Sequence, residues 1–216
     1  MKKAISTADD SMQEPKKLIT VRDLTVGYDT VLLKGISFSL SVGDRILLDG
    51  PSGCGKTTVL RALLGLPAPM SGTIRIGDQP AEQATIWHLR RELGYVPQEP
   101  ELGAESLMDF FERAFSFHAN RSLRPGDNEL GELMDRWLLP RPLLHKSCLD
   151  LSGGEKQRGA IILTILLRRK IILLDEPTSA LDKECRQILQ TWIRESGDRS
   201  FLIVSHDSPR RPPGWN

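Results

Sequence analysis

The amino-acid sequence predicts an α/β fold in which helices flank a buried parallel sheet. Two short apolar runs, Ile171–Leu174 and Phe201–Val204, are continuous and bounded by polar residues, which is typical of central strands covered on both faces. A third apolar run, Ile46–Leu48, leads into a glycine-rich loop and then into the helix-forming segment Thr58–Leu64. Strand, loop and helix in this order are the unit from which layered α/β domains are built.

The first third of the chain carries further strand signals. Short segments with apolar and β-branched residues are separated by turn signals at Gly27 and Gly43. A break rich in proline and glycine, Pro67–Gly72, comes after the first predicted helix. We therefore predict additional strands at Leu18–Val21, Gly35–Leu40 and Thr73–Ile76.

Residues 98–152 have a different, predominantly helical character. Apolar residues recur there at the spacing of one helix face. The helix that begins at Ser152 is nearly all apolar beyond Gly159, so we expect it to be buried on most sides. We predict helices at Leu107–Phe115, Leu130–Leu139 and Ser152–Arg168, and a loop at Arg121–Asn128.

Composition restricts the class of protein. The chain has 216 residues, 26% of them charged and 39% apolar, which is ordinary for a soluble globular protein with a well-buried core. A net charge of +1 gives no sign of a nucleic-acid-binding surface. The longest apolar stretch, Gly159–Leu167, is far shorter than the roughly 20 residues of a membrane-spanning helix. We therefore expect no transmembrane helix.

The two ends of the chain and its cysteines add further expectations. Residues 1–17 lack the apolar core of a secretory signal, and their polar composition predicts a disordered leader. The tail at 208–216 contains three prolines, which remove backbone donors, so we expect it to be irregular. Cys54, Cys148 and Cys185 are widely spaced and match no metal pattern, which favours a reducing compartment.

The strongest chemical signal lies between the predicted strand at Ile46–Leu48 and the helix after it. The segment reads G-x-x-x-x-G-K-T and ends in Lys56 and Thr57. Its glycines let backbone N–H groups curl around phosphate oxygens, Lys56 can reach the β- and γ-phosphates, and Thr57 can ligate Mg²⁺. A glycine-rich turn with an incidental lysine is the alternative, and the strand and helix on either side disfavour it. The predicted nucleotide-binding residues are Gly50, Pro51, Ser52, Gly53, Cys54, Gly55, Lys56, Thr57 and Thr58.

Two carboxylates, Asp175 and Glu176, directly follow the apolar run Ile171–Leu174. Open α/β sheets bind their ligands at the carboxyl ends of the strands. Asp175 is placed to hold Mg²⁺, and Glu176 is placed to accept a proton from an attacking water, the general-base role in hydrolysis. A strand end capped by two solvated acids is the alternative interpretation.

A second anion-binding pattern occurs at Leu151–Glu155. Ser152 can cap a helix, and Gly153 and Gly154 leave backbone N–H groups accessible to phosphate. One chain would then own two phosphate-binding helix ends. An ordinary serine-capped helix start is the alternative.

Taken together, these motifs resemble those of the ATP-binding cassette (ABC) ATPase family from about Leu18 to Asp207. The loop ending in Thr57 resembles the Walker A motif, and Leu151–Glu155 resembles the signature motif. Asp175 and Glu176 resemble the Walker B motif with its catalytic glutamate. The resemblance implies a P-loop ATPase core with a mixed central sheet and flanking helices, an antiparallel β subdomain, and a helical subdomain inserted at about residues 99–158.

The resemblance also implies roles for residues outside these three motifs. Tyr28 would stack on the adenine, and Gln98 in the Q-loop would contact Mg²⁺ and water. His206 would be the switch histidine that contacts the γ-phosphate, and Asp182 would belong to the D-loop near the nucleotide. In the head-to-tail dimer of the family, Ser152, Gly153 and Gly154 would bind the ATP held by the other protomer. The catalytic residues would be Glu176, His206 and Gln98, and the Mg²⁺ ligands Thr57, Gln98 and Asp175.

As the resemblance implies, the leading functional interpretation is the ATP-hydrolysing subunit of an ABC transporter, with ATP and Mg²⁺ as its cofactors. It would work as a homodimer or a cassette heterodimer beneath an integral membrane permease subunit, on the cytoplasmic side of the inner membrane, without nucleic acid. The stretch Leu133–Pro140 and the signature that follows are similar to small stand-alone bacterial ATP-binding subunits linked to metal export, iron included.

Two alternatives belong to other classes. A soluble cassette ATPase acting on ribosomes or DNA ends would usually carry two cassettes or a long coiled-coil insertion, whereas residues 98–152 are compact here. A non-hydrolytic regulatory cassette would not need Glu176 and His206, and both are present. The family usually continues past the switch histidine with a further strand and helix, so we expect the sheet to end early, after Phe201–Val204.

Overall fold

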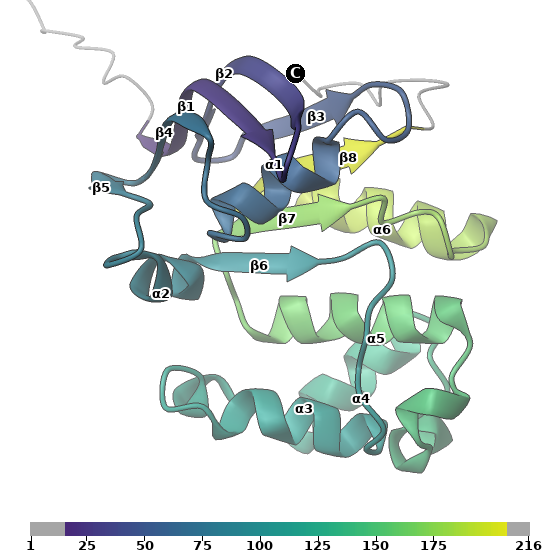
Figure 1. Cartoon of the computed structure of the whole chain (residues 1–216). Coiled ribbons are helices and arrows are strands. Elements are labelled where there is room, and N and C mark those ends of the chain that lie inside the picture. The colour runs from purple at the N-terminus through teal and green to yellow at the C-terminus, as the bar shows by residue number, and fades with distance from the viewer. Residues whose placement is uncertain (1–15, 207–216) are drawn as a thin grey trace, which may run out of the picture.

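The computed structural model describes residues 16–206. The fold is built on two four-stranded β-sheets (Figure 1). In one sheet all neighbouring strands are parallel, and in the other all neighbouring strands are antiparallel. The parallel sheet has the order β3 (Arg45–Asp49), β8 (Ser200–Ser205), β7 (Ile171–Asp175) and β6 (Leu93–Val96). The antiparallel sheet has the order β2 (Val31–Ser41), β1 (Lys17–Gly27), β4 (Ser71–Ile76) and β5 (Gln79–Pro80).

The helices lie around the parallel sheet, and the view in Figure 1 shows α5 (Gly153–Leu166) between β6 and the pair α3 (Leu107–Ser116) and α4 (Asp127–Arg136). Short 3₁₀ turns join several of them, at Arg90–Glu92, Arg121–Leu123, Arg141–His145 and Cys148–Asp150. Within residues 16–206, no helix has the length and apolarity needed to cross a membrane. The helices are α1 (Lys56–Leu63), α2 (Ile86–Leu89), α3 (Leu107–Ser116), α4 (Asp127–Arg136), α5 (Gly153–Leu166) and α6 (Lys183–Glu195).

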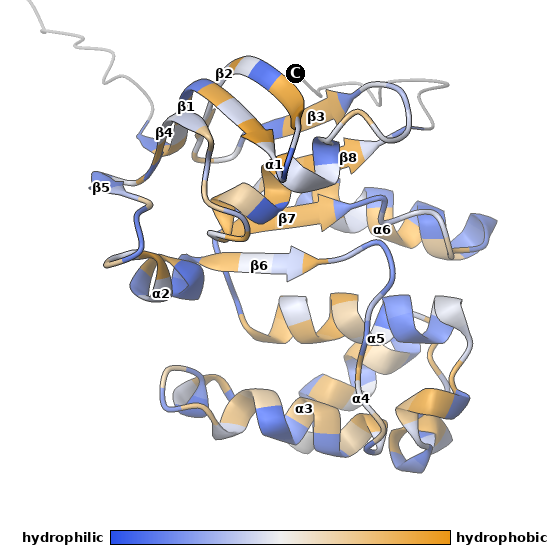
Figure 2. Ribbon diagram, in the orientation of Figure 1, coloured by the Kyte–Doolittle hydropathy of each residue, from blue (hydrophilic) through white to orange (hydrophobic). Residues whose placement is uncertain are grey.

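The parallel sheet is buried on both faces because its central strands carry the continuous apolar runs Ile171–Leu174 and Phe201–Val204. Successive side chains of a strand point to opposite faces. Ile171 and Leu173 pack in the core formed with α1 and the antiparallel sheet, whereas Ile172 and Leu174 pack in the core formed with α3, α5 and α6. Figure 2 shows β7 hydrophobic along most of its length, while α3 and α6 alternate between polar and apolar residues. Two cores therefore hold the β7 carboxyl end, where Asp175 lies, in a fixed position.

The predicted α/β fold class is confirmed, and so are the strands predicted at Ile46–Leu48, Ile171–Leu174 and Phe201–Val204. The strands predicted in the first third of the chain are also present, as parts of β1, β2 and β4. The predicted leader, residues 1–17, lies outside the described part except for residues 16 and 17, and the predicted tail, residues 208–216, lies wholly outside it. The boundaries predicted for the helical subdomain, 99–158, stay predictions.

The helix predicted at Leu130–Leu139 was placed wrongly, since α4 runs from Asp127 to Arg136. Leu138 has a φ of 52°, in the left-handed region that an α-helix cannot include. The chain therefore leaves the helix at Trp137, and Trp137 and Leu139 are buried as loop residues. The connection between α3 and α4 spans residues 117–126, so it begins and ends earlier than the predicted loop at Arg121–Asn128, and it contains a 3₁₀ turn.

Four elements were not predicted: α2, β5, β6 and α6. The α6 helix did have a sequence signal. Asp182 caps it by accepting the N–H of Cys185 at 2.8 Å, and its buried residues recur at helical spacing, at Cys185, Leu189, Trp192 and Ile193. The strand β6 is four residues long and carries Gly94, so its sequence pattern is weak.

Candidate nucleotide-binding site

A glycine-rich loop connects β3 to α1 in the arrangement that the sequence predicted. Gly53 and Gly55 have φ values of 76° and 100°, which glycine adopts without steric cost. A Cβ on Gly55 would also lie 3.0 Å from the Cβ of Leu32. The loop therefore needs glycine at this position both for its backbone conformation and for its contact with β2.

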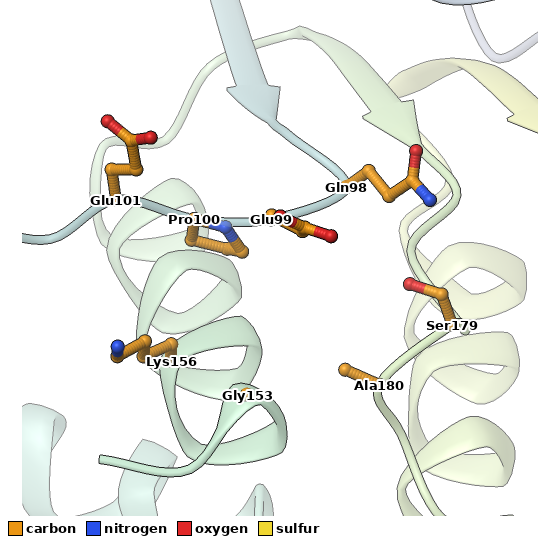
Figure 3. A pocket seen from close by; sticks show the side chains of 8 residues that line it. All are labelled: Gln98, Glu99, Pro100, Glu101, Gly153, Lys156, Ser179 and Ala180. Atoms are coloured by element: carbon orange, nitrogen blue, oxygen red, sulfur yellow. The ribbon is translucent and has the colours of Figure 1, made fainter. Parts of the chain in front are cut away.

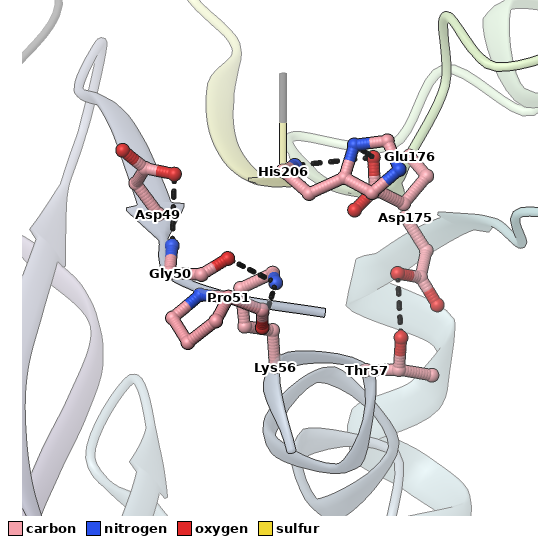
Figure 4. Close-up of polar contacts among 8 residues, drawn as sticks. All are labelled: Asp49, Gly50, Pro51, Lys56, Thr57, Asp175, Glu176 and His206. Carbon is pink, nitrogen blue, oxygen red and sulfur yellow. Dashed lines mark hydrogen bonds and ion pairs between the residues drawn. The ribbon is translucent and has the colours of Figure 1, made fainter. Parts of the chain in front are cut away.

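Lys56 folds back over this loop. Its Nζ donates hydrogen bonds to the carbonyl oxygens of Gly50 at 2.7 Å and Pro51 at 3.0 Å (Figure 4). The side chain is buried, with 7% of its surface exposed. An ammonium held at the centre of a glycine-rich loop at a helix N-terminus suits polyphosphate, because it adds positive charge to the backbone N–H groups. The loop therefore fits the phosphates of a nucleotide.

Thr57 and Asp175 meet across the gap between α1 and β7. The Thr57 hydroxyl donates to Oδ1 of Asp175 at 2.9 Å, and the Tyr95 hydroxyl donates to Oδ2 at 3.3 Å. Asp175 is 1% exposed, and burial raises the pKa of its carboxyl group. Burial, and then the neighbouring Asp175, raise the pKa of Tyr95 to about 12. A hydroxyl and a carboxylate at this distance fit the hard oxygen ligands that Mg²⁺ prefers.

Glu176 and His206 form the opposite wall of the site. Glu176 is 6% exposed, and its Oε2 accepts the backbone N–H of His206 at 3.3 Å and lies 3.5 Å from His206 Nδ1. Glu176 has a φ of 46°, and its own N–H donates to the carbonyl of Val204 at 2.9 Å. The parallel pairing of β7 with β8 places these two strand ends side by side. Figure 4 shows Glu176 and His206 above the loop that carries Lys56.

A pocket of about 220 Å³ brings nine of the predicted site residues together. It is lined by residues of the loop and α1, by Gln98 after β6, and by both members of the Glu176–His206 pair. Its lining residues are Leu32, Ser52, Gly53, Gly55, Lys56, Thr57, Thr58, Gln98, Glu176 and His206. In the described part of the chain, no group of three or more His, Cys, Asp or Glu could hold a metal by itself. A cation here would depend on Thr57, Gln98, the nearby Asp175 and the ligand's own oxygens.

Tyr28 lies apart from this pocket. It follows β1 and is 57% exposed. Hydrogen bonding with the hydroxyl groups of Tyr28 and Tyr95 raises the pKa of the Arg61 guanidinium on α1. The contact with Arg61 places the Tyr28 side chain beside this helix. The structure therefore places an exposed aromatic ring beside the helix that the phosphate loop begins.

The second predicted anion site also lies apart from the first. Ser152 Oγ accepts the N–H of Glu155 at 3.3 Å, and Glu155 Oε2 accepts the N–H of Ser152 at 2.7 Å, which closes a capping box at the start of α5. Gly154 passes so close to the next loop that a Cβ would lie 2.8 Å from the carbonyl oxygen of Ala180. A pocket of about 490 Å³ adjoins this helix end (Figure 3) and is lined by Gln98, Glu99, Pro100, Glu101, Gly153, Lys156, Ser179 and Ala180.

Sequence reasoning missed Tyr95 and Leu32 as members of the site. Tyr95 pairs with Leu173 in the neighbouring strand, so its side chain reaches Asp175 only because β6 lies next to β7. Leu32 belongs to the antiparallel sheet and closes one side of the phosphate pocket. Leu32 belongs to no motif, and Tyr95, although it lies three residues before Gln98, has no sequence signal for a contact with Asp175.

Comparisons with known proteins point to one family. The ABC transporter family profile matches residues 33–179. The "probable iron export ATP-binding protein FetA" of Escherichia coli K12 is 34% identical over 203 residues, which cover 91% of this chain and 88% of that protein. A sulfate/thiosulfate import ATP-binding protein, CysA of Methylococcus capsulatus, is 36% identical; the match covers 88% of this chain but 56% of that protein.

Solved structures give the same result. A bacterial Atm1-family ABC exporter with ATP bound is 28% identical with a TM-score of 0.76, over 94% of this chain and 37% of the exporter chain. The ATP-binding cassette MJ0796, a dimer in a post-hydrolysis state bound to ADP and Pi, has a TM-score of 0.74 over 88% of each chain. At 24% identity, this last likeness concerns the fold alone.

Proposed function

This chain belongs to the ABC transporter family, and we propose that it binds and hydrolyses ATP to drive a separate membrane subunit. The observation that carries the proposal is the pocket in which Lys56, Glu176 and His206 lie together. It joins a phosphate-binding loop to a buried carboxylate that can position or deprotonate an attacking water, and these are two recurring parts of sites that transfer a phosphoryl group. The histidine lies beside that carboxylate.

Thr57 and Asp175 are the proposed ligands of Mg²⁺, with Gln98 contributing from the Q-loop. The 2.9 Å hydrogen bond between Thr57 and Asp175 supports this assignment, because it brings two oxygen ligands to one point beside the phosphate loop. When bound, Mg²⁺ would neutralise charge that develops on the β- and γ-phosphates. Lys56 would contact the same phosphates from the other side.

Glu176 is the proposed general base. Its Oε2 would accept a proton from the water that attacks the γ-phosphate, and the backbone N–H of His206 helps to hold that oxygen in place. His206 would contact the γ-phosphate through its ring. Tyr28, exposed beside α1, would stack on the adenine.

Each ATP would be held between two copies of the cassette. Ser152, Gly153 and Gly154 lie at a helix end that does not line the phosphate pocket of the same chain. In a head-to-tail dimer this end would face the ATP of the partner, with Asp182 nearby. Closure on two ATP molecules would then drive transport, and hydrolysis would reset the dimer.

The proposed partner is an integral membrane permease on whose cytoplasmic side the chain is peripheral, at the inner membrane. Relatives of nearly equal identity are named for export of iron and for import of sulfate or thiosulfate, so similarity alone selects no cargo. The Escherichia coli relative, which matches over 88% of its length, favours a metal among the candidates.

Co-expression with the membrane protein encoded next to this chain tests the proposal. The chain should co-purify with that protein in detergent, and reconstitution of the pair should stimulate phosphate release. Sedimentation with ribosomes and no membrane partner would favour a soluble cassette ATPase instead. Absence of ATPase activity in every preparation, with ATP still bound, would favour a regulatory cassette.

A further inference from the structure

The buried Gln157 on α5 lies between the two nucleotide-contacting segments of the chain. It is one turn beyond Gly153 in the signature helix and has no exposed surface. Its Nε2 donates to the carbonyl oxygen of Pro97 at 3.4 Å, and Pro97 immediately precedes Gln98. One side chain thus connects the helix that begins at Ser152 to the backbone that carries Gln98.

The chain packs closely against α5 both before the Pro97 contact, at Gly94, and after it, at Leu107. A Cβ on Gly94 would lie 2.8 Å from Cγ2 of Thr164, and a Cβ on Gly159 would lie 3.2 Å from Cδ1 of Leu107. Packing therefore fixes the strand β6 and the start of α3 against α5. Between Gly94 and Leu107, Gln98 and Glu99 line the pocket of Figure 3. The hydrogen bond from Gln157 to Pro97 is a polar link between α5 and this part of the chain.

The other half of the Gln157 amide is unsatisfied. Its Oε1 is buried and has no hydrogen-bond partner among the described residues. A buried acceptor without a donor is costly, and such groups in native proteins call for an explanation. A methionine or leucine would fill the same space without this cost, so the amide is expected to serve the position of the Q-loop rather than the stability of α5.

We propose that Gln157 is a positioning residue that sets where Gln98 stands relative to the signature helix. It would act on hydrolysis through Gln98, without touching ATP itself. The unmatched Oε1 leaves room for a second arrangement, in which movement of the Q-loop brings a donor to it. This inference rests on the proposed function, because it presumes that Gln98 and Ser152 contact nucleotide.

A double-mutant cycle tests the inference. Gln157→Met keeps the length of the side chain and removes both the donor and the acceptor, and Gln190→Met makes the same change at an exposed position of α6. We expect Gln157→Met to bind ATP as the unmodified chain does, to unfold at the same or a higher temperature, and to lower the turnover rate about 10-fold or more, because misplaced catalytic groups are penalised steeply. Gln190→Met should leave all three unchanged.

The decisive measurement combines Gln157→Met with Gln98→Ala. If Gln157 acts through Gln98, the double variant should turn over no more slowly than Gln98→Ala alone. Losses that multiply in full, or normal turnover in folded Gln157→Met, would overturn the proposal. If Gln157→Met does not fold, Gln157→Leu, which likewise removes both the donor and the acceptor, enters the same cycle. Full turnover in Gln98→Ala would instead contradict the proposed function, so the two failures are distinguishable.

Discussion

The hydroxyl of Thr57 donates a 2.9 Å hydrogen bond to Oδ1 of Asp175, although the two residues are 118 positions apart in the sequence. Thr57 belongs to the first turn of α1 and Asp175 ends β7, so the bond joins the phosphate loop to the carboxylate end of the central strand. Glu176, the next residue, is thereby fixed above the same loop.

Glu176→Gln should retain ATP binding and lose turnover by about 100-fold or more, because the amide keeps the size of the side chain but cannot accept the proton. A dimer trapped by ATP should accumulate. Steady-state phosphate release and gel filtration with ATP and Mg²⁺ measure the two effects. Glu132→Gln, the same change at an exposed position of α4, is the control and should behave as the unmodified chain does. Near-normal turnover in Glu176→Gln would remove this residue from the catalytic role.

Ser152→Arg should abolish hydrolysis and leave ATP binding by the isolated chain intact, because Ser152 is proposed to face the nucleotide of the partner. Ser106→Arg is the matched control, since Ser106 caps α3 by accepting the N–H of Asp109 at 3.1 Å. Both changes remove an N-cap and should cost about 1 kcal/mol of stability. Mixing Ser152→Arg with Lys56→Ala protein should restore one composite site of two. A folded Ser152→Arg chain that cannot bind ATP would contradict the composite site.

Tyr95→Phe should raise the Mg²⁺ concentration needed for half-maximal ATPase activity by about 10-fold, since groups that orient a metal ligand typically contribute that much. The Tyr95 hydroxyl donates to Oδ2 of Asp175, and phenylalanine removes only this hydroxyl. Titration of the rate with Mg²⁺ at fixed ATP measures the effect, and saturating Mg²⁺ should restore most of the rate. An unchanged Mg²⁺ requirement would show that Thr57 alone orients Asp175.

Stability should depend on pH through Glu155. The backbone hydrogen bond from Ser152 holds the pKa of this carboxyl below its ordinary value of 4.5. Its contribution is therefore complete above pH 4.5 and is lost as the pH falls through the lowered pKa. We expect the unmodified chain to melt at a higher temperature than Glu155→Gln at pH 7, and the difference to close in acid. A difference that is constant down to the acid limit of folding would refute this linkage.

The sequence alone was sufficient for the features that local chemistry decides. Short apolar runs bounded by polar residues are typical of strands buried on both faces, so β7 and β8 could be predicted as central strands. The glycines of the phosphate loop and the Ser152–Glu155 capping box are likewise determined by residues a few positions apart. The residues assigned to the nucleotide from these motifs stay predictions until variants are measured.

Tertiary structure decided the features in which distant segments meet. Pairing of β6 with β7 brings Tyr95 to Asp175, and pairing of β7 with β8 brings His206 to Glu176, because parallel neighbours place their carboxyl ends at one edge of the sheet. The end of α4 was missed for a related reason. Leu138 adopts a left-handed conformation so that Trp137 and Leu139 can be buried, and burial against other elements outweighed the local helical pattern.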